Sequence, residues 1–122
     1  MKRILLAEDE EILRMLIRDT LEDQNFLMDE AADGQEAIQH LEENAYDLVI
    51  LDHMMPVYTG LEVIQLLRQS LKKTELKVMM LSAKSGQEER EKAIQTGADY
   101  FMPKPFSPGE LLTKIKEILN EA

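Results

Sequence analysis

Short, unbroken runs of apolar residues limit most strongly what this chain can fold into. The clearest are Ile4–Ala7, Asp47–Asp52 and Lys77–Ser82, and each is bounded by polar residues. Because a strand that is covered on both faces has no solvent-facing side, such runs predict strands inside a parallel sheet. Leu27–Ala31, which is mixed in polarity and suits a sheet edge, and Tyr100–Met102 are weaker strand candidates.

Apolar residues at helical spacing lie between and after these runs. The sets are Ile12, Leu13, Leu16, Ile17 and Leu21; Ala37, Ile38 and Leu41; Val63, Ile64 and Leu67; and Leu111, Leu112, Ile115, Ile118 and Leu119. Each set forms a stripe that can cover one face of a sheet. A further helix is expected to end at Gly97. The chain therefore alternates five strands with five helices.

Three helix starts carry capping signals, in which a Ser or Asp precedes a Glu by three residues. The pairs are Asp33 with Glu36, Ser85 with Glu88, and Ser107 with Glu110. Pro108 follows at the first position of the last helix, where a missing N–H leaves no hydrogen bond unmade. These signals mark helix starts independently of the apolar pattern.

The alternation predicts a doubly wound α/β fold, with one parallel sheet and helices on both faces, because right-handed crossovers place each helix against the sheet. A length of 122 residues with no linker or repeat suits one domain. Ligands of such sheets bind beyond the carboxyl ends of the strands, where the strand order reverses. Functional residues are therefore expected directly after the strands.

The balance of charge argues against nucleic acid and membranes as partners. Acidic residues outnumber basic ones by 24 to 14, and the formal charge of -10 repels nucleic acid and anionic lipid. No apolar run approaches the roughly 18 residues that cross a bilayer. The absence of cysteine excludes thiolate chemistry and suits a reducing compartment. We expect a cytoplasmic protein with no membrane and no direct nucleic acid binding.

Carboxylates follow two of the clearest strands. Glu8 and Asp9 end the first strand and Asp52 ends the third, so all three should meet at the carboxyl edge of the sheet. Like charges at such a site are costly unless they are protonated, paired or neutralised by a cation, and Mg²⁺ is the hard cation that suits carboxylates. The alternative is that Asp9 caps the first helix and that Glu8 is solvated.

A hydroxyl and an ammonium follow two other strands. Ser82 ends the fourth strand and Lys104 follows the fifth. Together with a metal ion, they would place positive charge and a hydrogen-bond donor around one carboxylate, which is a pocket for phosphoryl oxygens. Taken singly, Lys104 could be a solvated lysine or an ordinary ion pair, and Ser82 could cap a turn.

These segments resemble the receiver domain of bacterial two-component response regulators, of the chemotaxis-receiver kind. The matching segments are Glu8-Asp9, Asp52-His53-Met54-Met55-Pro56 with Gly60, Ser82-Ala83, and Lys104-Pro105-Phe106. They occur in the family's order, each on the corresponding strand end, and the likeness spans nearly the whole chain. The resemblance implies a flavodoxin-like receiver fold with strand order 2-1-3-4-5 and a single receiver domain over residues 1–122.

The resemblance also implies a phosphorylation site. Asp52 would accept a phosphoryl group from a sensor histidine kinase or a phosphotransfer protein. Asp9, Asp52 and the backbone carbonyl of Met54 would bind Mg²⁺, or Mn²⁺ in its place, and Glu8 would act through water. The chain would be a signalling domain rather than an enzyme, with self-catalysed phosphotransfer and autodephosphorylation only.

A switch is implied by the remaining family positions. Ser82 would donate to a phosphoryl oxygen, and Lys104 would pair with Asp52 and then with the phosphoryl group. Tyr100 would turn inward as the hydroxyl is drawn in, so that a downstream protein or a second copy reads the Tyr100 face. The Lys104–Pro105 bond would be cis. The segment after Phe106 also resembles receivers fused to effectors, so the alternative is a receiver cut from a longer DNA-binding response regulator.

Two other functions fit the pattern less well. Phosphatases with an aspartate nucleophile usually carry a second acid two residues later, but Glu11 stands at that distance from Asp9 and falls on the helix. Flavodoxin-like nucleotide binders have loops rich in glycine or hydroxyl residues after the first strand. Here the loop is acidic and would repel a phosphate in the absence of a metal ion.

Overall fold

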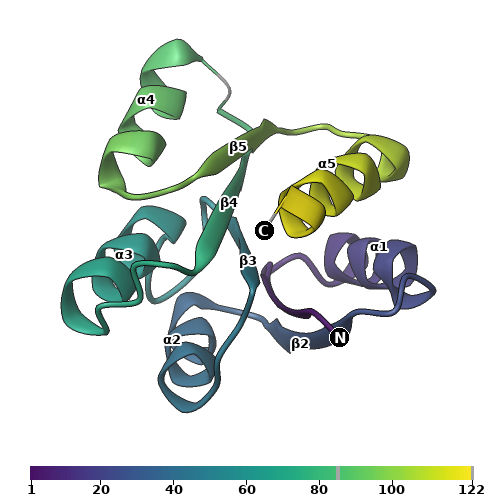
Figure 1. Ribbon diagram of the computed structural model, residues 1–122. Coiled ribbons are helices and arrows are strands. Elements are labelled where there is room, and N and C mark those ends of the chain that lie inside the picture. The colour runs from purple at the N-terminus through teal and green to yellow at the C-terminus, as the bar shows by residue number, and fades with distance from the viewer. Residues whose placement is uncertain (85, 122) are drawn as a thin grey trace.

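All five strands run parallel in one sheet of order β2-β1-β3-β4-β5, with helices on both faces (Figure 1). The computed structural model describes residues 1–84 and 86–121. The elements are β1 (Arg3–Ala7), α1 (Glu11–Glu22), β2 (Leu27–Ala31), α2 (Gly34–Glu43), β3 (Leu48–Asp52), α3 (Gly60–Gln65), the π-helical turn η1 (Leu66–Ser70), β4 (Lys77–Ser82), α4 (Gln87–Thr96), β5 (Tyr100–Pro103) and α5 (Pro108–Glu121). The predicted fold class and strand order are confirmed.

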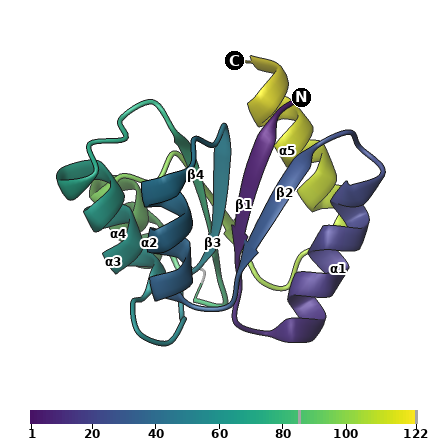
Figure 2. The same ribbon diagram turned by 90° about the horizontal axis from the view of Figure 1, so that it is seen from below.

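The sheet separates two hydrophobic layers. Helices α1 and α5 cover one face, and α2, α3 and α4 cover the other (Figures 1 and 2). Alternate residues of β1 and β3 point into opposite layers, so both strands are buried throughout apart from half-buried Arg3. The unbroken apolar runs of these strands follow from this double coverage. The mixed polarity of β2 fits its place at the edge of the sheet.

Two helices depart from the predicted stripes. In α1, Ile17 and Leu21 are buried, but Ile12 is 84% exposed and Leu16 is 45% exposed. The apolar stripe of α1 is therefore wider than the surface that the sheet and α5 cover. The third helix was predicted as one regular stripe, but it ends in η1, which still buries Leu67.

The caps agree in part with the sequence. Asp33 Oδ1 accepts from the Glu36 N–H at 2.8 Å, whereas the Glu36 carboxylate accepts from the Ala32 N–H rather than completing a box with Asp33. Ser107 Oγ accepts from the Glu110 N–H at 3.1 Å. The pair of Ser85 with Glu88 lies outside the described residues. A complete capping box that the sequence reading missed, Thr59 with Glu62, opens α3, and Gly97 ends α4 as predicted with φ at 133°.

The strand register brings the ends of four strands together. Ala7 pairs with Leu51, Asp52 with Leu81, and Ser82 with Pro103. Functional residues that follow β1 and β5, or end β3 and β4, therefore meet at the carboxyl ends of the strands. These ends point downward in Figure 2. Within the described part of the chain, none of the helices has the length and apolar character needed to span a membrane.

Candidate functional site

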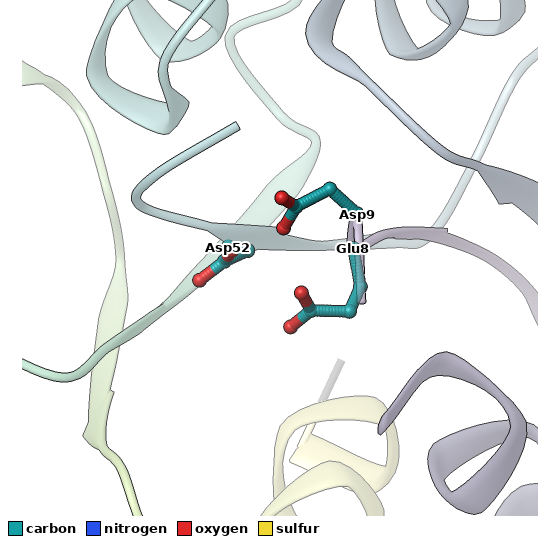
Figure 3. A group of neighbouring side chains, drawn as sticks. All are labelled: Glu8, Asp9 and Asp52. Atoms are coloured by element: carbon teal, nitrogen blue, oxygen red, sulfur yellow. The ribbon is translucent and has the colours of Figure 1, made fainter. Parts of the chain in front are cut away.

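Three carboxylates converge beyond the ends of β1 and β3 (Figure 3). Glu8, Asp9 and Asp52 each offer an oxygen, and these oxygens all lie within 4.8 Å of one another. Glu8 is fully buried and Asp52 is 5% exposed, whereas Asp9 is open to solvent. Glu8 is therefore not the solvated residue that the alternative reading of the sequence allowed.

One ammonium joins these acids. Lys104 Nζ lies 2.8 Å from Asp52 Oδ1 and 3.0 Å from Glu8 Oε1. Lys104 lies in the loop after β5, and its backbone N–H donates to the Ser82 carbonyl at 2.8 Å. The Lys104–Pro105 peptide bond is cis, as the resemblance implied. We call Glu8, Asp9, Asp52 and Lys104 the acid pocket.

Burial of the charged groups in the acid pocket appears in their pKa values. Burial raises the pKa of Glu8 to about 7, although the Glu10 N–H and Lys104 oppose this. Burial likewise raises the pKa of Asp52 against the lowering effect of Lys104. Burial would lower the pKa of Lys104, but its contacts with Asp52 and Glu8 outweigh burial and raise it. The pocket sets three carboxylates beside one ammonium, and burial makes their ionised forms costly, so that a further cation would stabilise them.

The donor set fits a hard divalent cation. Carboxylate oxygens are the ligands that Mg²⁺ and Mn²⁺ prefer, and three of them can reach one point here. Met54, two residues after Asp52, lines the same cavity as Asp9 and Asp52 and is 60% exposed. Asp9, Asp52 and Glu8 are therefore the residues whose carboxylates could hold such an ion.

Two glycines fix the loop that carries Met54. The Gly34 N–H at the start of α2 donates to the Pro56 carbonyl, and a Cβ on Gly34 would overlap Tyr58. A Cβ on Gly60 would stand 2.6 Å from the Asp52 carbonyl oxygen. Close approach of backbone to backbone at both glycines therefore holds the loop against α2 and β3.

Ser82 is buried beside the acid pocket. It is 1% exposed, and its Oγ accepts from the Lys84 N–H at 3.0 Å and lies 3.3 Å from His53 Nδ1. A cavity of about 260 Å³ opens at this point. It is lined by Asp9, Glu10, Asp52, His53, Met54, Ser82, Ala83, Lys84 and Lys104. The sequence-predicted carboxylates Asp9 and Asp52, the hydroxyl of Ser82 and the ammonium of Lys104 thus border one space, which is large enough for a phosphoryl group.

Tyr100 lies apart from this cavity. It begins β5 at the edge of the sheet, is partly buried against the layer of α1 and α5, and has Lys114 Nζ 5.2 Å from its ring centre. Of the residues named from the sequence, the structure therefore brings together Glu8, Asp9, Asp52, Met54, Ser82 and Lys104, and leaves Tyr100 outside.

Two residues beside the site were not singled out in the sequence. His53 contacts Ser82, and Arg14 donates to the Glu8 carbonyl at 2.8 Å while pairing with Glu30 at 3.3 Å. His53 was visible as the neighbour of Asp52, but its contact depends on the pairing of β3 with β4. Nothing in the local pattern marks Arg14, because it lies on α1 and its partner Glu30 lies on β2.

Comparison with known sequences identifies relatives along nearly the whole chain. Residues 4–116 match the profile of the response regulator receiver domain. The phosphate regulon transcriptional regulatory protein PhoB of Klebsiella pneumoniae is 39% identical over 119 residues, which are 98% of this chain and 52% of that protein. The transcriptional regulatory protein ResD of Bacillus subtilis is 39% identical over 98% of this chain and 49% of its own length. The chain thus spans about half the length of these relatives.

Solved structures give the same answer. The receiver domain of Francisella response regulator 1452 has a TM-score of 0.92 at 27% identity. The match covers 99% of this chain and 98% of that one. The chemotaxis response regulator CheY4 of Vibrio cholerae has a TM-score of 0.91 at 29% identity, with 97% and 98% covered. With the family's profile matched over most of its length, the chain belongs to the response regulator receiver domains of two-component systems, a family of signalling domains rather than enzymes.

Proposed function

We propose that this domain is a phosphorylation switch in which Asp52 accepts a phosphoryl group from the phosphohistidine of a sensor histidine kinase or a phosphotransfer protein. An Asp52 oxygen attacks phosphorus, the bond from phosphorus to the imidazole nitrogen breaks, and that nitrogen keeps the electron pair. The observation that carries the proposal is the 2.8 Å contact of Lys104 Nζ with Asp52 Oδ1 in the acid pocket, where both residues line the cavity.

Receiver domains use Mg²⁺ at an acidic site, and we assign that role here to Asp9, Asp52 and the Met54 carbonyl, with Glu8 acting through water and with Mn²⁺ as a substitute. A bound ion would supply positive charge to the phosphoryl oxygens. Lys104 pairs with Asp52 before transfer and with the phosphoryl group after it. Ser82 donates its hydroxyl hydrogen to a phosphoryl oxygen. The same residues support self-catalysed phosphotransfer from small donors and autodephosphorylation.

Two surfaces serve partners in this proposal. The kinase docks on α1 and the loop after β5, where Ile12 and Leu16 leave apolar side chains in solvent. Movement of Ser82 toward the phosphoryl group leaves space that Tyr100 enters. A downstream protein or a second copy then reads the face of α4, β5 and α5. The domain is in equilibrium between a form with Tyr100 outward and a form with Tyr100 inward. Phosphorylation shifts this equilibrium only as far as it stabilises one form more than the other.

The placement of this domain in a larger protein is a second part of the proposal. We treat residues 1–122 as a single receiver domain that works in the cytoplasm. The alternative is the receiver of a longer DNA-binding regulator, and the transcriptional regulators that it matches along half their length favour that reading. In either case the formal charge of -10 argues that this domain itself does not bind DNA.

Intact mass spectrometry tests the central claim. Incubation with Mg²⁺ and acetyl phosphate should add the mass of one phosphoryl group, and chelation of the ion should prevent it. The Asp52→Asn variant should stay unmodified because its amide cannot supply the attacking oxygen, while Asp47→Asn, a matched change at the other end of β3, should label normally. Normal labelling of Asp52→Asn would refute the assignment.

Chemical-shift mapping tests the switch. Addition of beryllofluoride, a phosphoryl mimic, with Mg²⁺ should change resonances around Asp52 and also around Tyr100 and along α4, β5 and α5. Changes confined to the acid pocket would show that phosphorylation does not reach the Tyr100 face.

A further inference from the structure

We infer that His53 is a positioning residue that holds the Ser82 hydroxyl in its unphosphorylated arrangement and competes with the phosphoryl group for the hydroxyl hydrogen. The inference rests on the proposed function, because it concerns how readily this hydroxyl reaches a phosphoryl oxygen. Its basis is the 3.3 Å contact between His53 Nδ1 and Ser82 Oγ.

The sheet fixes the backbone on which the His53 ring is mounted. The N–H of His53 donates to the Leu81 carbonyl at 2.9 Å, and its carbonyl accepts from the Gly60 N–H at 2.8 Å. These bonds extend the pairing of β3 with β4, in which Asp52 lies opposite Leu81. The backbone of His53 is therefore held beside Ser82 as the next step of the same register, and its ring lies within reach of the hydroxyl.

The direction of the hydrogen bond follows from the needs of the hydroxyl. Ser82 is 1% exposed, and its Oγ already accepts from the Lys84 N–H. Its own hydrogen needs an acceptor, since buried polar groups are almost always hydrogen-bonded. Among residues 1–84 and 86–121, His53 Nδ1 is the acceptor in reach. The imidazole therefore carries its hydrogen on Nε2 and accepts at Nδ1.

This arrangement opposes the phosphorylated state. The hydroxyl has one hydrogen, so it cannot donate to His53 Nδ1 and to a phosphoryl oxygen at once. Breaking the bond to His53 offsets part of the gain from the new bond. Removal of the Nδ1 acceptor should therefore favour the phosphorylated form, and the net worth of one such hydrogen bond corresponds to about a two- to tenfold change in affinity.

The affinity for beryllofluoride at saturating Mg²⁺ measures this competition. His53→Phe keeps an aromatic ring of similar size and removes the acceptor, so we expect it to bind about two- to tenfold more tightly than the wild type. His40→Phe is the matched control. His40 lies on α2, its Nε2 is 3.1 Å from the Glu30 carbonyl of β2, and it does not line the cavity, so this variant should bind beryllofluoride as tightly as the wild type. Equal or weaker binding by His53→Phe would overturn the inference.

A double-mutant cycle separates this role from a merely structural one. In a Ser82→Ala background there is no hydroxyl to restrain, so His53→Phe should leave the beryllofluoride affinity unchanged. A gain that persists in that background would show that His53 acts by another route and would overturn the inference.

Nitrogen NMR of the unmodified wild type provides a measurement that needs no variant. His53 should carry its hydrogen on Nε2, and the Nδ1 resonance should shift when beryllofluoride binds; hydrogen on Nδ1 in the unphosphorylated protein would overturn the inference. If the wild type takes up no beryllofluoride at all, the proposed function fails as well. If the wild type binds it but His53→Phe does not differ, the inference alone fails.

Discussion

The carboxylates at the two ends of the sheet differ in how they are paired and in the direction of their pKa shifts. At the carboxyl end, the acid pocket sets three carboxylates against one ammonium, and burial raises the pKa of Glu8 and of Asp52. At the amino end, Arg3, Asp29, Tyr46 and Asp47 form what we call the amino-edge network. There the Tyr46 hydroxyl and Arg3 lower the pKa of Asp29 despite some burial.

Geometry explains the difference. Asp29 accepts from the Tyr46 hydroxyl at 2.6 Å and from Arg3 at 2.9 Å, and the Arg3 guanidinium also lies 5.1 Å from the centre of the Tyr46 ring. Each charge in the amino-edge network therefore has a partner within the chain. The acid pocket instead leaves negative charge for a ligand to neutralise. The charged groups at the amino end are thus hydrogen-bonded within the folded chain, whereas the acid pocket holds negative charge that a bound cation would neutralise.

The largest effect on stability is expected when the ammonium of the acid pocket is removed. Without Mg²⁺ at pH 8, Lys104→Ala should lower the free energy of unfolding by about 3 kcal/mol, because two buried carboxylates lose their counterion. Added Mg²⁺ should still bind, through ligands that the substitution leaves intact, and should restore much of the loss. Urea titration with and without the ion measures both effects. A loss of Mg²⁺ affinity instead would show that Lys104 supports the metal site itself.

The pH dependence of stability should differ in sign between the two ends. The folded-state pKa of Glu8 is about 7 against an ordinary value of 4.5, so the folded protein binds more protons between these values. In metal-free protein this contribution is fully present below pH 4.5 and is lost as the pH rises through 7, on the order of 3 kcal/mol. Asp29 acts oppositely: its contribution is present above its ordinary pKa of 3.8 and is lost as the pH falls below that value.

Melting temperatures from pH 4 to 8 in chelator measure the Glu8 contribution. Glu8→Gln should flatten the decline between pH 4.5 and 7 relative to the wild type. Glu42→Gln, a change on the exposed side of α2, should leave the decline unchanged. An identical slope in Glu8→Gln and the wild type would show that Glu8 does not carry the predicted proton.

The smallest expected effect is at the amino-edge network. Tyr46→Phe should lower the free energy of unfolding by about 1 kcal/mol, since Asp29 loses one hydrogen bond but keeps Arg3. Because this network is remote from the cation, the loss should be the same with and without Mg²⁺, unlike that of Lys104→Ala. Tyr58→Phe, which changes a more exposed tyrosine, should have no effect. Dependence of the Tyr46→Phe loss on Mg²⁺ would mean that the two ends are coupled.

The fold could be predicted from the sequence because the burial of each strand is visible in its own run of residues. The unbroken apolar runs of β1, β3 and β4 predicted the sheet, and strand ends predicted where Glu8, Asp9, Asp52, Ser82 and Lys104 would gather. Contacts across strands could not be read in the same way. The bond of His53 with Ser82, the pairing of Lys104 with Glu8 and the exposure of Ile12 depend on register and on how far a neighbouring helix reaches.

The pairing of Glu8 with Lys104 joins residues 96 positions apart, and this has a consequence for synthesis. On the ribosome, Glu8, Asp9 and Asp52 emerge long before the ammonium that pairs with two of them. A nascent chain that has exposed only the first four strands therefore carries the carboxylates without their counterion. The site becomes complete only when β5 has joined the sheet. The phosphorylation proposed for Asp52 would thus be a property of the finished domain rather than of a partly synthesised chain.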